Sequence, residues 1–124
     1  MKDTKASGIP RLVAAWRNSW AGLRDIWRNE EAFRIEAVLF VLSIPAAAFL
    51  CSSIGQFALL TGSLLLLMIV EILNSAIEAA IDRIGPERHE LSRIAKDLGS
   101  LAVLLAMVLA GIVWAGAIWD AVFA

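Results

Sequence analysis

Residues 37–70 read AVLFVLSIPAAAFLCSSIGQFALLTGSLLLLMIV, and none of these side chains is charged. A second uncharged stretch covers residues 98–119. A helix crosses the hydrocarbon core of a bilayer with about 20 apolar residues. The first stretch is long enough for one span, a turn and most of a second span, and the second stretch supplies a third. The sequence therefore predicts transmembrane helices over residues 33–50, 57–84 and 92–119, with Ser92 as the N-cap of the last one.

The composition agrees with a membrane protein built from helices. Hydrophobic residues make up 60% of the 124-residue chain and the mean hydropathy is +0.75, whereas soluble domains average roughly 45–50% apolar residues. The length limits the chain to one domain, so residues 1–124 are predicted to form a single integral membrane domain of the all-α class. The net charge of −1 gives no reason to expect nucleic acid as a partner.

The positions of the basic residues predict how the chain is oriented in the membrane. All 11 of them lie either before or at the very start of the first predicted span or around the connection between the second and third spans. Basic residues are concentrated in the cytoplasmic segments of membrane proteins. We therefore predict that the N-terminus and the second connection are cytoplasmic and that the C-terminus lies on the outer side.

An amphipathic pattern precedes the spans. Apolar residues recur there every three or four positions, the period of one helix face: Ile9, Leu12, Val13, Trp16, Trp20, Leu23 and Trp27. Tryptophan favours the membrane interface because it is apolar but carries one N–H donor. We predict a helix over residues 9–30 on the cytoplasmic leaflet, preceded by a disordered tail over residues 1–8. The alternative is an amphipathic helix packed on a soluble protein core.

The second predicted span carries polar residues on one face. Glu71, Asn74, Ser75, Glu78 and Asp82 are spaced as i, i+3, i+4, i+7 and i+11, so they share one side of a helix. A carboxylate at the bilayer centre costs at least ~2.5–3.5 kcal/mol, and these acids must therefore face protein, metal or water. Such a face could present oxygen ligands to magnesium. The alternative is a polar seam between helices, whose hydrogen bonds contribute ~0.6 kcal/mol each.

A second group of charges lies around the connection between the second and third predicted spans. It consists of Glu87, His89, Glu90, Arg93, Lys96 and Asp97. A lysine at this position could hold a phosphate as a point charge, although a solvated loop has the same composition. The chain contains neither a P-loop nor a dinucleotide-binding glycine motif. The residues alone therefore indicate an acidic, metal-binding site at the membrane boundary and do not separate a kinase from a transporter.

Several segments resemble one known family. They are residues 19–24 (SWAGLR), 29–36 (NEEAFRIE), 71–83 (EILNSAIEAAIDR), 89–92 (HELS) and 95–100 (AKDLGS). From about residue 9 to residue 119 the chain is similar to prokaryotic diacylglycerol kinase, an integral membrane lipid kinase. The resemblance implies a homotrimer of three-span subunits, each with a surface helix, in the bacterial inner membrane with a periplasmic C-terminus. It also implies direct in-line transfer of phosphate from MgATP to diacylglycerol, giving phosphatidic acid, at composite sites between subunits.

The resemblance also implies roles for individual residues. Glu71 would be the general base, Glu30 and Glu78 would bind Mg²⁺, and Asn74 and Asp82 would support the site. The residues expected to contact ATP are Arg11, Glu30, Glu78, Glu87, His89, Lys96 and Asp97. Those expected to contact the lipid are Arg11, Trp20, Arg24, Phe33, Arg34, Glu36, Glu71 and Ser100.

Two other functions remain open from the sequence. Relatives that phosphorylate undecaprenol share much of the 71–83 motif, although the tryptophan-rich segment before the spans favours diacylglycerol. A small ion or proton conduit is a function of a different class. It fits less well, because a pore should also place polar residues on the third span, and residues 103–118 contain none beyond Trp114.

Overall fold

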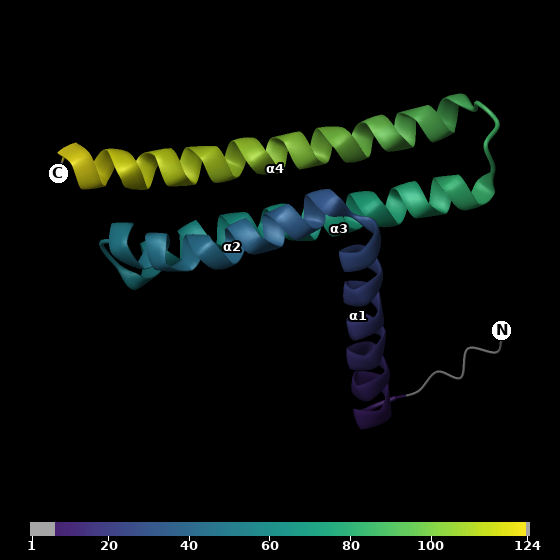
Figure 1. Ribbon diagram of the computed structural model, residues 1–124, viewed down its shortest axis with the longest axis horizontal. Helices are drawn as coiled ribbons and strands as arrows, with labels where there is room; N and C mark the ends of the chain where they lie inside the picture. The colour runs from purple at the N-terminus through teal and green to yellow at the C-terminus, as the bar shows by residue number, and fades with distance from the viewer. Residues whose placement is uncertain (1–6, 124) are drawn as a thin grey trace. The chain divides into compact units, whose positions relative to one another are not determined.

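The computed structural model describes residues 7–123, and within them the chain is entirely helical apart from short connections. Four helices follow one another (Figure 1): α1 (Ile9–Asn29), α2 (Glu31–Leu50), α3 (Ile54–Ile84) and α4 (Glu90–Phe123). Helices α2, α3 and α4 are long and apolar enough to cross a membrane. The prediction of an all-α chain with three helices able to span a membrane is therefore confirmed. Residues 1–6 of the predicted tail lie outside the described part of the chain.

The chain divides into two units between Glu31 and Ala32. The first unit contains α1, which has a proline in its first turn, where the missing N–H is not needed. The helix ends at Asn29 and is followed by the C-cap residue Glu30, whose backbone is extended and whose N–H donates to the carbonyl of Ile26 at 2.9 Å. Trp16 and Trp20, one turn apart, pack edge to face with ring centroids 5.9 Å apart.

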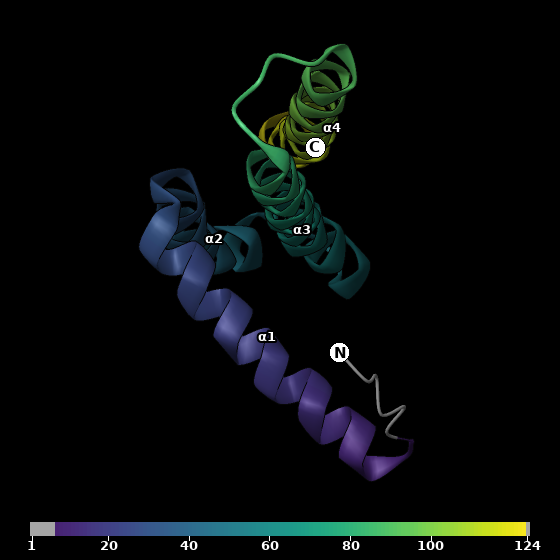
Figure 2. The ribbon, with the colours of Figure 1, turned by 90° about the vertical axis from the view of Figure 1, so that its right-hand side faces the viewer.

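The second unit contains α2, α3 and α4. Helices α3 and α4 run antiparallel beside each other (Figures 1 and 2). The least exposed positions of α4 recur every three or four residues, as in a two-helix seam: Gly99, Val103, Ala106, Ala110, Val113 and Ala117. Most of these side chains are small, which lets the two backbones approach closely.

Near the C-terminal end of α4, helix α2 packs against α3 and α4. Ala47 of α2, Leu60 of α3 and Ala117 of α4 form a buried cluster with half-buried apolar neighbours. The Trp114 ring donates from Nε1 to the backbone carbonyl of Leu60 at 3.1 Å, which ties α4 to α3. Elsewhere, large apolar side chains such as Leu42 and Leu105 are mostly exposed. Such outer faces suit hydrocarbon or neighbouring helices, because a helix pairs its backbone polar groups internally.

Three helix starts lie two or three residues before the predicted ones. Helix α2 begins at Glu31 and not at 33. Side-chain contacts account for the starts of the other two helices. Helix α3 begins at Ile54 and not at 57, because the Ser53 hydroxyl accepts from the Gln56 N–H at 3.1 Å while Gln56 Oε1 accepts from the Ser52 N–H at 2.7 Å. Helix α4 begins at Glu90, so Ser92 lies inside it and is not its N-cap. The backbone N–H of Leu91 donates to His89 Nδ1 at 3.1 Å instead.

Candidate functional site

The polar face of α3 turns towards the protein. Glu71, Asn74, Ser75 and Glu78 are half-buried, whereas the apolar residues between them, such as Leu73, are exposed. This is the reverse of a helix in water and matches a helix whose apolar sides face lipid. The Asn74 amide nitrogen donates to Glu78 Oε1 over a long 3.4 Å, so neighbouring members of the face are in contact.

At the deeper end of this face, α2 contributes a second carboxylate. Glu36 and Glu71 lie close enough for their charges to interact. Oε2 of Glu36 is buried and has no hydrogen-bond partner among the described residues. Phe33, one turn earlier on α2, is only 2% exposed. The structure thus brings the predicted base, Glu71, near one of the predicted lipid-contacting residues of α2, Glu36.

At the other end of the face, an ion pair connects α3 to α4. Lys96 Nζ donates to Asp82 Oδ1 at 3.0 Å, and the two side chains are 45% and 70% exposed. An ion pair this exposed contributes about 0–1 kcal/mol to stability. Its geometry is more informative than its energy, because it places the Lys96 ammonium group at the solvent-accessible end of the acidic face.

A pocket of about 680 Å³, lined mostly by residues with charged side chains, includes both members of this ion pair. It is lined by the end of α3, the connection 85–89 and the start of α4, including Asp82, Glu87, His89, Arg93 and Lys96. The connection leaves α3 through Gly85, whose φ of 154° a side chain would strain. The volume of the pocket is within the usual range for small-molecule sites, roughly 300–1,000 Å³.

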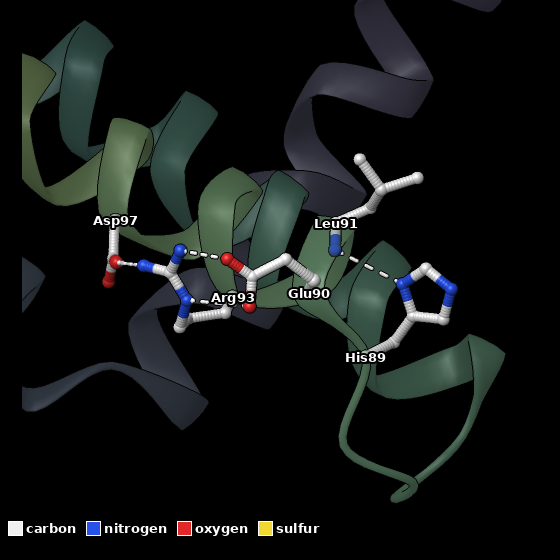
Figure 3. Close-up of polar contacts among 5 residues, drawn as sticks. All are labelled: His89, Glu90, Leu91, Arg93 and Asp97. Carbon is white, nitrogen blue, oxygen red and sulfur yellow. Dashed lines mark hydrogen bonds and ion pairs between the residues drawn. The ribbon is translucent and has the colours of Figure 1, made fainter.

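Arg93 holds two carboxylates at the start of α4 (Figure 3). Its guanidinium group pairs with Glu90 one turn before it and with Asp97 one turn after it, the latter at 2.7 Å. Arg93 belongs to the charged group around this connection, but the resemblance assigned it no role. Its spacing of i−3 and i+4 from two acids is the signal that could have identified it. The pairing connects Asp97, a predicted nucleotide contact, to Arg93, which lines the pocket.

The remaining predicted site residues are distributed over both units. Ser100 lies on α4 and Arg34 on α2. The other residues belong to the first unit, either on α1 or, in the case of Glu30, at its end: Arg11, Trp20, Arg24 and Glu30.

Comparison with known proteins identifies the family. Residues 17–118 match the family model of prokaryotic diacylglycerol kinase, so the match covers most of α1 and α4 and all of α2 and α3. The chain belongs to the prokaryotic diacylglycerol kinase family. It is 50% identical to the diacylglycerol kinase of Escherichia coli (strain K12) over 114 residues, which cover 92% of this chain and 93% of that protein.

Two further relatives also align with this chain over most of both lengths. The diacylglycerol kinase of Haemophilus influenzae is 45% identical over 90% of this chain and 95% of its own length. The diacylglycerol kinase of Pseudomonas aeruginosa is 45% identical over 88% of this chain and 89% of its own length. The resemblance read from the 71–83 motif and its neighbours is therefore confirmed at the level of the family.

The side chains that could bind the expected Mg²⁺ in this member of the diacylglycerol kinase family are few. Within residues 7–123, no three acidic, histidine or cysteine side chains are grouped in a way that could hold a metal ion. Magnesium usually takes one or two carboxylates and completes its shell with phosphate oxygens and water. The half-buried carboxylate of Glu78, beside the Asn74 amide, is a ligand of the type that such a cation takes from a protein.

Proposed function

We propose that this chain phosphorylates diacylglycerol with ATP, giving phosphatidic acid, at the cytoplasmic face of the bacterial inner membrane. Membership of the prokaryotic diacylglycerol kinase family and relatives of that name at 45–50% identity support the reaction. One structural observation supports it most. The half-buried acids Glu71 and Glu78 lie on the same face of α3 as Asp82, and Asp82 and Lys96 line the pocket at the end of this helix. A lipid hydroxyl and a water-soluble nucleotide could meet along that face.

The chemistry requires a base near the lipid hydroxyl. We assign this role to Glu71, which lies on the span and beside Glu36. The Glu71 carboxylate takes the hydroxyl proton, the lipid oxygen bonds to the γ-phosphorus of ATP, and the bond to the bridging oxygen breaks as ADP leaves. Phosphoryl transfer of this kind depends on positioning and on neutralising charge more than on covalent help from the protein.

The nucleotide is assigned to the pocket at the α3–α4 end. Lys96 holds a phosphate there and exchanges its contact with Asp82 for it. The residues assigned to the remaining contacts are Arg11, Glu87, His89 and Asp97. Glu78 and Glu30 hold Mg²⁺, which neutralises phosphate charge when it is bound with ATP. Asn74 directs Glu78 through the amide contact, and Arg93 holds Asp97 in place.

The lipid is assigned to residues of α1 and α2 and to Ser100 of α4. The exposed apolar side chains of α1, among them Ile9, Leu12 and Trp16, would lie in the cytoplasmic leaflet, as expected for an amphipathic surface helix. We assign contacts with diacylglycerol to Arg11, Trp20, Arg24, Phe33, Arg34, Glu36 and Ser100. The basic residues near these positions also support a cytoplasmic N-terminus and a periplasmic C-terminus.

We further propose that the chain works as a homotrimer with sites shared between subunits. Two observations support this assembly. The faces of α2, α3 and α4 expose many large apolar side chains, which neighbouring subunits could cover in part. In addition, the described residues offer too few grouped ligands for a complete metal site, so a neighbouring subunit could supply the glutamate of residue 30.

The proposed function is tested by transfer of radiolabelled phosphate from ATP to diacylglycerol in mixed micelles, with and without Mg²⁺. We expect lipid phosphorylation that requires Mg²⁺. Glu71→Gln keeps the size and polarity of the side chain but removes the base, so it should lower kcat by on the order of 10²–10⁴-fold while the protein still assembles. Near-normal turnover of this variant would exclude Glu71 as the base.

The same assay separates the alternatives. Undecaprenol supplied in competition with diacylglycerol gives a ratio of kcat/KM values, and a ratio in favour of undecaprenol would reassign the lipid substrate. An ion conduit would instead give proton flux in vesicles without ATP. Membership of the diacylglycerol kinase family favours the kinase over both.

A further inference from the structure

Asn74 of α3 and Gly99 of α4 are in unusually close contact. Gly99 is buried in the seam between the two helices. A Cβ atom added to it would lie 2.1 Å from Oδ1 of Asn74, 3.3 Å from its Cγ and 3.9 Å from its Cβ. The side-chain amide of Asn74 therefore occupies the space that any other residue at position 99 would fill.

The contact determines which way the Asn74 amide faces. Its oxygen is turned towards α4, where it is buried and has no hydrogen-bond partner among residues 7–123. The Cα–H group of Gly99 beside it is at most a weak donor. The amide nitrogen is turned the other way and donates to Glu78 Oε1 at 3.4 Å. The oxygen and nitrogen of an amide lie in one plane, so a group that displaced the oxygen at Gly99 would also move the nitrogen.

We propose that Gly99 is a positioning residue that orients Glu78 through Asn74. By leaving room for the amide oxygen, Gly99 keeps the amide nitrogen on Glu78, and this contact directs the carboxylate towards the phosphates and their cation. The inference rests on the proposed function for the role of Glu78. It adds a residue of α4 that need touch neither nucleotide nor lipid.

The substitution Gly99→Ala tests this proposal. Alanine is favoured over glycine within a helix, and the added methyl group would strike the end of a short side chain that can rotate away. Gly99→Ala should therefore leave the fold intact and turn the Asn74 amide away from Glu78. Gly116, on the same helix, has no neighbouring atom within 4 Å of an added Cβ, which makes Gly116→Ala the matched control.

The first measurement does not depend on turnover. In the ¹⁵N-labelled full-length protein in detergent, the side-chain amide resonance of Asn74 is assigned by its loss in Asn74→Ala. Gly99→Ala should shift this resonance and Gly116→Ala should not. An Asn74 resonance unchanged by Gly99→Ala would overturn the proposal.

The second measurement is kinetic. Gly99→Ala should lower kcat/KM for MgATP by on the order of 10–100-fold, as expected for a misplaced polar group, and should raise the Mg²⁺ concentration needed for half-maximal rate. The KM for diacylglycerol should stay at the wild-type value. A purely structural defect would lower the amount of active protein without changing the Mg²⁺ requirement, and that result would overturn the proposal.

A double substitution tests whether Gly99 acts through Asn74. In Asn74→Ala the added Cβ of residue 99 would meet only the Cβ of residue 74, at an ordinary 3.9 Å. Asn74→Ala/Gly99→Ala should therefore fold and be as active as Asn74→Ala alone, because the two effects share one route. A further loss in the double variant, or a failure of both Gly99→Ala and the double variant to fold, would overturn the inference.

The proposed function and this inference can fail separately. Wild-type protein that binds MgATP but transfers no phosphate to diacylglycerol would refute the function. The role of Gly99 in orienting Asn74 would then be tested by the Asn74 resonance and by the affinity for MgATP. This affinity is measured as a thermal shift in wild type, Gly99→Ala and Gly116→Ala.

Discussion

Helices α3 and α4 are joined by two kinds of contact, one within the apolar span and one at its polar end. Within the span, the Asn74 amide lies against buried Gly99, and the seam continues through small neutral residues. At the polar end, Lys96 meets Asp82 at 3.0 Å with both side chains well exposed. The first contact is neutral, tight and buried, whereas the second is charged, open and accessible.

The two contacts have different consequences for energy and for function. An exposed ion pair contributes about 0–1 kcal/mol, so Lys96 can exchange Asp82 for a phosphate at little cost to the fold. The buried seam fixes the distance between the backbones and leaves no room for larger side chains. Substitutions at the polar end should therefore change nucleotide kinetics without changing stability, and substitutions in the seam remote from Asn74 should do the opposite.

Among substitutions at these two contacts, Lys96→Met is expected to have the largest effect. Methionine keeps an unbranched side chain but removes the charge that we assign to phosphate binding. Loss of one charged group that stabilises the transition state lowers kcat/KM for MgATP by on the order of 10²–10³-fold. The midpoint of thermal unfolding in detergent should stay near the wild-type value, because the lost ion pair is exposed.

Lys96→Arg provides the comparison for this prediction. It keeps the charge and should recover part of the activity lost in Lys96→Met. Equal losses in both variants, or a large drop in thermal stability of Lys96→Met, would mean that the polar end contributes to the fold as the seam does.

Ala117→Leu tests the opposite contact. Ala117 is 2% exposed and packs against Ala47 and Leu60, so the larger side chain should destabilise the protein by about 1–3 kcal/mol through overpacking. Ala115→Leu, at an exposed position two residues earlier, should change stability by no more than about 0.5 kcal/mol. Resistance to denaturation in detergent measures both, and equal stability of the two variants would show that the seam is not tightly packed.

The contrast between the two contacts also explains what the sequence could predict. The three spans follow from hydrophobicity, and the polar face of α3 follows from helical spacing, since both depend on residues near in sequence. Arg93 belongs to the same class, because its distances from Glu90 and Asp97 along the chain place all three on one side of α4. Helical spacing alone is therefore enough to predict that network of charges.

Other features depend on how one helix is placed against another. The contact between Asn74 and Gly99 requires the register of α3 on α4, which no local pattern determines. The same is true of Lys96 and Asp82 and of Glu36 beside Glu71. The early start of α3 is an intermediate case. The Ser53 hydroxyl accepts from the Gln56 N–H and Gln56 Oε1 accepts from the Ser52 N–H, and these local contacts are a helix-start signal that a hydrophobicity pattern does not contain.

Asp82→Asn is expected to have the smallest effect of this series and tests the exposed ion pair most directly. Asparagine keeps the shape of the side chain and a possible hydrogen bond to Lys96 Nζ but removes the charge. Since the pair is worth about 0–1 kcal/mol, the KM for MgATP should change by no more than about five-fold, and stability should be almost unaffected. A steady-state titration with MgATP measures the change.

Ionic strength then shows whether the Asp82 effect is electrostatic. Charges exposed to solvent are screened over about 10 Å at 0.1 M salt and about 3 Å at 1 M. The difference in KM between wild type and Asp82→Asn should therefore shrink as salt is raised, whereas the effect of Gly99→Ala, which acts through a buried neutral contact, should persist. If Asp82→Asn instead lowered kcat/KM as much as Lys96→Met does, and salt did not change this loss, Asp82 would take a direct part in phosphoryl transfer. The exposed end of the α3–α4 pair would then tolerate substitution as poorly as the buried seam.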